Sequence, residues 1–189
     1  YRPLVVWGGY TEGQVHCSVG SDNRKGGYIA AKHLIDRGCS RRGRFRGPKA
    51  LEIGQRREGC RDAMAEAGLS ETLSVLPAHL VAEAAHPDIA RYLGSVGERP
   101  QGIVAASDVI AMSALRALSE FGLAVPGDVH VIGYDGLAIC EQTVPRLSTV
   151  SQDLTQGAHH MVDMLLRRIA GEDTQSVVME PQLIVRMSS

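Results

Sequence analysis

An aspartate that follows a short apolar run is the residue of this chain best suited to bind a small molecule. Residues 129–132, Val-His-Val-Ile, are mostly apolar and rich in β-branched side chains, which predicts a buried strand. Gly133 allows the backbone to turn where this strand ends, and Asp135 follows two residues later. Ligands of open α/β sheets bind outside the carboxyl ends of the strands. Asp135 is therefore expected to accept hydrogen bonds from hydroxyl or amino groups of a ligand.

The other reactive side chains form no pattern that predicts catalysis or metal binding. No nucleophile, base and orienting residue stand at a recognisable spacing, and no glycine-rich phosphate loop is present, so neither enzyme activity nor a cofactor is expected. His159 and His160 are neighbours, and neighbouring helix residues face different directions, so they are not expected to share a metal ion. The four cysteines lack metal-ligand spacing and predict free thiols in a reducing compartment.

The composition is that of an ordinary globular chain with one or two domains. Of its 189 residues 44% are hydrophobic, and the formal net charge is -1. No apolar run is long enough for a membrane span and no signal peptide is recognisable, so a cytoplasmic protein without a membrane partner is expected. Residues 1–3 lead directly into a strand-like run, which suggests that an N-terminal part is missing.

Strand-like and helix-like segments alternate along the chain. Short apolar runs predict strands, and apolar residues at helical spacing closed by glycine predict helices. The expected strands are residues 4–7, 73–76, 102–106, 129–134 and 182–186, and the expected helices are 24–37, 52–67, 88–96, 109–121 and 154–170. Repeated β-α-β units need right-handed crossovers and a parallel sheet covered on both faces. The chain is therefore predicted to be a doubly wound α/β protein.

Two aspartates stand next to the starts of predicted helices. Asp108 directly precedes helix 109–121 and is a natural N-cap for it. Asp22 lies two residues before helix 24–37, where it either caps that helix or faces the ligand cleft.

Seven short motifs stand in the order expected of bacterial repressors. They are SDN at 21–23, GP at 47–48, RREGC at 56–60, ASD at 106–108, VPGDV at 125–129, GYD at 133–135 and PRLSTVSQD at 145–153. Each motif alone is common, but seven in this order are a strong signal, and the similarity extends over nearly the whole chain. The chain resembles the effector-binding domain of the lactose-repressor (LacI/GalR) family, whose fold is related to that of periplasmic sugar-binding proteins.

The resemblance implies a ligand site made by residues of several motifs. Arg56 takes the place of the arginine that hydrogen-bonds the effector in this family, and a guanidinium group suits vicinal hydroxyls or a carboxylate. Asp135 takes the place of the aspartate that accepts from ligand hydroxyls. Ser107 stands where many members contact the ligand. Asp108 beside it either contacts the ligand or caps its helix.

Further site residues are implied on the other side of the cleft. Gln152 lies near a crossover between the two subdomains, where other members contact the ligand or the hinge. Tyr10 follows the first strand and occupies the opposite wall. Trp7 either stacks on a sugar or packs in the core. A metal site is not implied.

The resemblance also implies two subdomains, one of which is incomplete. Residues 1–19 and 153–178 are expected to form a partial N-subdomain, and residues 20–152 and 179–189 a complete C-subdomain. The helix-turn-helix domain of the family is absent from this chain. Operator DNA is therefore expected to be bound only through that missing N-terminal domain.

Residues 41–46 depart from the family pattern, because arginines stand where an apolar central strand is expected. Each buried arginine costs several kcal/mol unless it is paired. The strand is therefore displaced, exposed by the truncation or wrongly recorded, and the sequence does not decide among these.

The implied function is regulation by ligand-dependent closure. A sugar or nucleobase-like effector would favour one closure angle and so change the spacing of DNA-binding heads in a homodimer. Residues 111–118 and 61–67 are candidate dimer contacts, with packing on the sheet as the alternative for both. The competing hypothesis is a periplasmic solute-binding protein of a sugar transporter.

Overall fold

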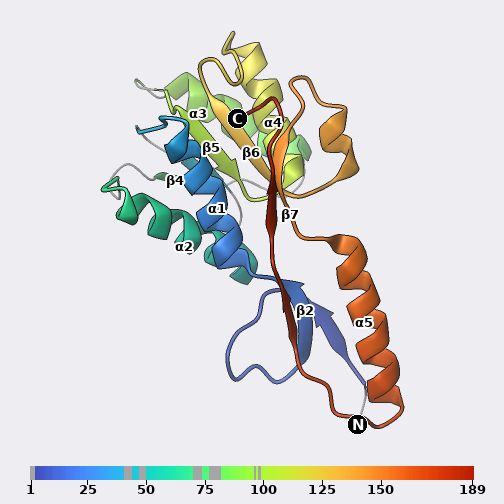
Figure 1. Ribbon diagram of the computed structural model, residues 1–189. Coiled ribbons are helices and arrows are strands. Elements are labelled where there is room, and N and C mark those ends of the chain that lie inside the picture. The colour runs from blue at the N-terminus through green and yellow to red at the C-terminus, as the bar shows by residue number, and fades with distance from the viewer. Residues whose placement is uncertain are drawn as a thin grey trace.

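The strands of the chain form two separate sheets (Figure 1). The structure is a computed structural model that describes residues 3–40, 44–46, 50–69, 74–76, 82–95, 97 and 99–189. The small sheet is parallel with the order β1-β2-β8, and its strands are Val5–Trp7, Cys17–Ser21 and Val177–Met179. The large sheet has the order β4-β3-β5-β6-β7-β9, and its strands are Ser74–Leu76, Arg44–Arg46, Gly102–Ala105, His130–Asp135, Ser148–Ser151 and Gln182–Ile184.

Helices cover both faces of the large sheet, as the predicted doubly wound α/β class requires. α1 (Asn23–Asp36) and α4 (Asp108–Glu120) contact its strands, α2 (Leu51–Glu66) packs on α1, and α3 (Ala82–Ser95) packs on α4. The 3-10 helix η2 (Ala138–Glu141) follows β6, and α5 (Leu154–Ile169) packs on the small sheet. A Cβ atom on Gly133 of β6 would meet Ala111 of α4. The hydroxyl group of the next residue, Tyr134, lies against Gly26 of α1. Successive strand residues point to opposite faces, so α1 and α4 lie on opposite sides.

The core lies around central strands that are buried on both faces. All residues of β5 and residues 131–134 of β6 are buried, as expected for strands of a parallel sheet. The apolar face of α4 packs in this core through Ala111, Ala114, Leu115 and Leu118. Of the two alternatives for residues 111–118, the structure supports packing on the sheet for this face, because burial leaves it no surface for a second copy.

Several elements differ from those predicted. β2 and β7 consist largely of small polar residues, so they show no apolar run although the structure buries most of them. β9 pairs with β7 in the antiparallel direction, whereas the sequence predicted a purely parallel sheet. α3 begins at Ala82 instead of residue 88, because the helix continues through Pro87, a residue type that usually marks a helix boundary.

The arginine-rich segment takes the place of a central strand. The backbone of Arg44–Arg46 pairs in parallel with β4 on one side and with β5 on the other. The strand is therefore not displaced from the sheet. Residues 41–43 and the side chains of 44–46 lie outside the described part of the chain.

Three connections join the two sheets, and they follow β2, β7 and β8 (Figure 1). Asp22, in the first connection, caps α1 by accepting a hydrogen bond from the backbone N–H of Lys25 at 2.9 Å. Residues 20, 21 and 179 lie in strands of the small sheet, although they were expected in the other subdomain.

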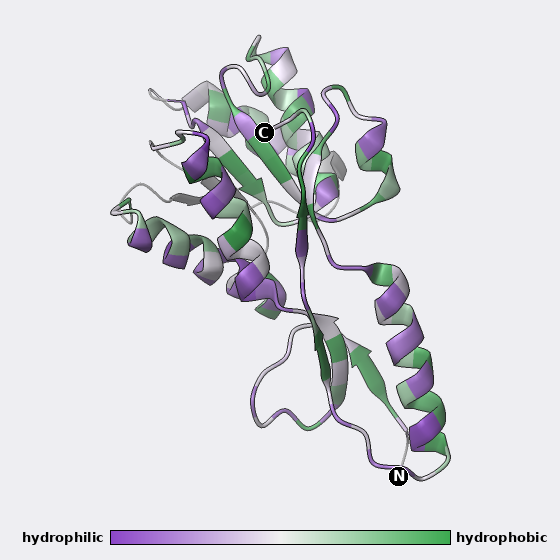
Figure 2. Ribbon diagram, in the orientation of Figure 1, coloured by the Kyte–Doolittle hydropathy of each residue, from purple (hydrophilic) through white to green (hydrophobic). Residues whose placement is uncertain are grey.

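The small sheet carries exposed apolar side chains. Val19, Met164 and Met179 form a core between its strands and α5. Outside this core, Figure 2 shows apolar residues along α5 and the strands. Those exposed to solvent include Val6, Val162, Leu166, Ile169 and Val178. No helix in the described part of the chain combines the length and apolar character that crossing a bilayer requires.

Glycine residues bring α1 and α2 into backbone contact. A Cβ atom on Gly59 would lie 1.8 Å from the carbonyl oxygen of Arg24, and one on Gly27 would lie 1.8 Å from that of Arg56. Neither distance leaves room for a methyl group. This close approach sets the position of Arg56 relative to the start of α1.

The helix contact predicts opposite effects for two alanine substitutions in α2. Gly59→Ala is expected to lower the free energy of unfolding by about 1–3 kcal/mol or more, because the backbones must separate. Gly54→Ala meets no atom within 4 Å and is expected to stabilise the chain by up to about 1 kcal/mol. Urea unfolding of both variants checks this, and equal midpoints would contradict it.

Candidate functional site

Arg56 is a buried cation held on three sides by the protein. Arg56 belongs to α2, and the residue is 6% exposed. Its Nε donates to Oδ1 of Asn23 at 2.8 Å, and its Nη1 donates to the carbonyl oxygen of Ala106 at 2.5 Å. Its Cζ lies 3.7 Å from the ring centre of Tyr134. Burial lowers the pKa of Arg56, but an arginine this close to a carboxylate and an aromatic face remains charged.

Asp135 faces Arg56 from the end of β6. The two side chains are 3.9 Å apart between Nη1 and Oδ1, and the same Oδ1 accepts a hydrogen bond from Nε2 of Gln152 at 2.8 Å. The structure therefore brings together Asp135, Arg56 and Gln152, three of the predicted site residues. Burial raises the pKa of Asp135 to about 6, although Arg56 opposes this rise. Above that pH the carboxylate is charged and can accept hydrogen bonds, as it does from Gln152 in the connection after β7.

The backbone at Asp135 has an unusual conformation. Its φ angle is 124°, which L residues rarely adopt, and Gly136 follows with φ 80°. A Cβ atom on Gly136 would lie 2.7 Å from Oγ of Ser151, so only glycine fits there. Such strained residues persist where the surrounding structure holds them, and they are frequent at ligand sites.

Ser107 and Asp108 have structural partners. Oγ of Ser107 accepts from the backbone N–H of Ile110 at 3.3 Å, so Ser107 is the N-cap of α4 and the prediction that Asp108 caps this helix is wrong. The helix begins one residue earlier than expected. Asp108 is fully buried and accepts from Thr149 and Leu137, so the structure does not place it in the cleft.

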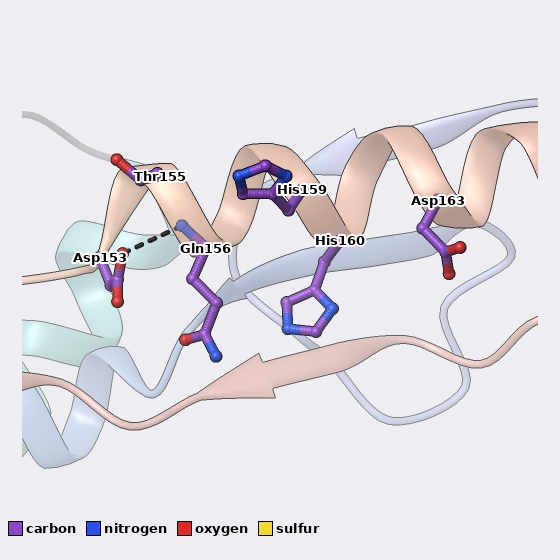
Figure 3. A pocket seen from close by; sticks show the side chains of 6 residues that line it. All are labelled: Asp153, Thr155, Gln156, His159, His160 and Asp163. Carbon is purple, nitrogen blue, oxygen red and sulfur yellow. Dashed lines mark hydrogen bonds between the residues drawn. The ribbon is translucent and has the colours of Figure 1, made fainter.

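A hollow of about 700 Å³ adjoins Asp135. Its lining comes from residues 135–138, Ser151, residues 153–156, His160, residues 177–180 and Gln182. A second hollow of about 460 Å³ lies on α5, where Asp153 accepts from the backbone N–H of Gln156 at 3.0 Å (Figure 3). Figure 3 shows His159 and His160 pointing to different sides of the helix.

The loop that follows β1 is tied to α2. The backbone N–H of Gly9 donates to Oε1 of Glu52 at 3.1 Å, and Nε2 of Gln55 donates to the carbonyl oxygen of Tyr10 at 2.9 Å. The side chain of Tyr10 is exposed. These hydrogen bonds connect the part of the chain that carries the small sheet to the part that carries the large sheet. Gln55, which makes one of them, directly precedes Arg56 in α2.

Trp7 packs against α5. A Cβ atom on Gly157 would lie 2.3 Å from the indole ring, so the ring occupies the space that a side chain at 157 would take. Trp7 is not among the residues that line either hollow. The structure therefore shows Trp7 packed on α5, but the residue is 36% exposed and does not belong to the core cluster of the small sheet.

The sequence interpretation missed Asn23 and Tyr134 as partners of Arg56. Both stand in motifs that it had singled out, SDN and GYD. Their contact with Arg56 depends on the approach of α1 and α2 and on the alternation of β6. No sequence spacing gives these distances.

The chain is similar to known regulators over almost its whole length. A family model for the periplasmic binding protein-like domain matches residues 31–189. The HTH-type transcriptional repressor PurR of Edwardsiella ictaluri (strain 93-146) is 32% identical over 191 residues, which cover 98% of this chain and 56% of PurR. The PurR of Escherichia coli O1:K1 / APEC is 34% identical over 168 residues, covering 87% and 49%. This chain thus spans about half the length of the curated relatives it matches.

Solved structures with the same fold include ligand complexes. A LacI family transcriptional regulator from Enterococcus faecium with bound ribose has a TM-score of 0.88 and 26% identity, covering 99% of this chain and 70% of that chain. The complex of the transcriptional regulator CelR with cellobiose has a TM-score of 0.86 and 31% identity, covering 98% and 58%. All of these relatives are described as transcriptional regulators and none as an enzyme, in agreement with the sequence prediction.

The raised pKa of Asp135 predicts a pH-dependent gain for Asp135→Asn. The folded state binds this proton more tightly than the unfolded state, so the wild type loses stability as the pH rises from about 4 to about 6. The variant does not titrate there. Relative to the wild type, it should gain on the order of 2 kcal/mol in unfolding free energy between about pH 4 and about pH 7.

Urea unfolding at both pH values measures this gain, with Asp62→Asn as the control. Arg24 lowers the pKa of Asp62, so its stabilising effect is present at neutral pH and is lost on acidification. Asp62→Asn should therefore lose stability relative to the wild type as the pH rises. An Asp135→Asn gain that is the same at both pH values would contradict the assignment.

Proposed function

Because the chain belongs to the LacI family, as its periplasmic binding protein-like effector domain, we propose that it binds a small polar effector between Arg56 and Asp135. The observation that carries the proposal is the pairing of a buried guanidinium with a strained, partly exposed carboxylate at the connections between two sheets. A charged donor and a charged acceptor in one site suit vicinal hydroxyls or the polar edge of a nucleobase. Gln152 orients the carboxylate.

The effector class is a sugar or a nucleobase-like molecule. Solved relatives contain ribose and cellobiose, and the curated relatives are named PurR. The remaining predicted site residues have supporting roles in this proposal. Tyr10 belongs to the opposite wall, while Ser107 and Trp7 support the wall through capping and packing.

Effector binding would act by closing the two halves on each other. The halves correspond approximately to residues 1–19 with 153–178 and to residues 20–152 with 179–189. An effector shifts such an equilibrium only by its difference in affinity for the two states. In the whole protein, the closure would change the spacing of helix-turn-helix domains on operator DNA in the cytoplasm. The exposed apolar residues of α5 and the small sheet are surfaces that the rest of an N-subdomain would cover.

A homodimer is part of the same proposal. Of the two candidate contacts, residues 61–67 of α2 and its end still have exposed side chains, including Arg61 and Glu66. Light scattering coupled to size-exclusion chromatography over a range of concentrations tests the proposal. A monomer at every concentration would count against it for this chain.

A ligand screen on matched arginine variants tests the site. Ribose, cellobiose and guanine are added to the wild type, and one of them should raise its melting temperature with increasing concentration. Arg56→Lys should weaken that response about 10- to 100-fold in affinity, because lysine cannot reproduce the paired contacts. Arg57→Lys is the control, since Arg57 is partly exposed and its Nη2 lies 3.5 Å from Glu58. If the ligand raises the melting temperature of Arg56→Lys as much as that of the wild type, the assignment of Arg56 to the site is wrong.

A further inference from the structure

A buried carboxylate lies beneath the turn that carries Asp135. Oδ1 of Asp108 accepts from the hydroxyl of Thr149 at 2.6 Å, and Oδ2 accepts from the backbone N–H of Leu137 at 2.8 Å. Oγ1 of Thr149 in turn accepts from the backbone N–H of Gly136 at 3.2 Å. These three hydrogen bonds join the start of α4, the strand β7 and the two residues that follow Asp135.

The surroundings of Asp108 are shaped to accommodate it. Asp108 is fully buried, and burial raises its pKa, while the donors from Thr149 and Leu137 lower it. A Cβ atom on Gly133 would lie 2.2 Å from Oδ1 of Asp108, so the glycine in β6 leaves the space that the carboxylate fills. A buried carboxylate is costly, and here it satisfies backbone donors of a turn with two successive positive φ angles.

We propose that Asp108 and Thr149 are positioning residues for effector binding, which hold residues 135–137 in the conformation that directs the Asp135 carboxylate toward Arg56. Without these acceptors, the backbone N–H groups of Gly136 and Leu137 lose their hydrogen bonds to Thr149 and Asp108. Asp135 then relaxes from its φ of 124°. The pair acts through the turn and touches no ligand. The inference rests on the proposed function only where it refers to the effector.

Thr149→Val and Thr149→Ser form a matched test, because valine keeps the shape and serine keeps the hydroxyl. The readout is the pKa of Asp135, followed by the carboxyl carbon signal in NMR titrations. The charged groups that act on this carboxylate are Arg56 from α2 and Asp108 from α4. Thr149→Val should lower the pKa of Asp135 from about 6 by about one pH unit or more, toward the ordinary value, because a relaxed carboxylate regains water and burial is the largest cause of the raised pKa. Thr149→Ser should keep the pKa near that of the wild type.

A folded Thr149→Val variant whose Asp135 still titrates like the wild type would overturn the proposal, even if the variant were less stable. A fall of equal size in Thr149→Ser would also overturn it. Should Thr149→Val not fold, Leu137→Pro removes the other donor, since the φ of Leu137 is -66° and suits proline. The same fall in pKa is expected there, and an unchanged value would refute positioning.

A ligand experiment connects the turn to binding. Any probe among ribose, cellobiose and guanine that stabilises the wild type should lose most of its thermal shift in Thr149→Val and keep it in Thr149→Ser. An equal shift in both variants would overturn the proposal. A wild type that none of the probes stabilises would count against the proposed function alone, because the titration of Asp135 needs no ligand.

Discussion

The desolvation of one guanidinium group governs the arrangement of the large half of this chain. Arg56 has lost water on almost every side, so protein atoms must replace it. The replacements come from separate elements: Asn23 at the start of α1, the carbonyl of Ala106 after β5, and the ring of Tyr134 in β6. Asn23 reaches Arg56 because glycines allow α1 and α2 to approach backbone to backbone. The helix packing and the site therefore depend on each other.

Asp135 shows that the site is assembled against local preference. A carboxylate on a strained backbone, partly removed from water, is unfavourable by itself. The contacts of the carboxylate with Arg56 and Gln152 offset part of this cost. The hydrogen bond from Gly136 to Thr149 stabilises the turn that follows. Departures of this kind from local rules are expected at binding sites, where a stable scaffold supports them.

The residues that carried the sequence prediction are those whose role follows from position along a strand or in a motif. Asp135 follows an apolar run, and the resemblance placed Arg56 in the same effector site. The sequence could not show that Ser107, and not Asp108, caps α4, because both residue types cap helices and a shift of one residue decides between them. The sequence also could not predict the strands β2 and β7. Their small residues form no apolar run, and neighbouring elements bury them.

Trp7 is the single tryptophan of the chain, and its packing makes it an optical reporter. The indole lies against Gly157 of α5 and lines neither of the two hollows, so its fluorescence senses how β1 sits on that helix. The loop directly after β1 is tied to α2 through Gly9 and Glu52, next to Arg56. A change in the angle between the two sheets would pull on this tie and alter the environment of the indole. Its emission would therefore follow the motion of one half of the chain relative to the other.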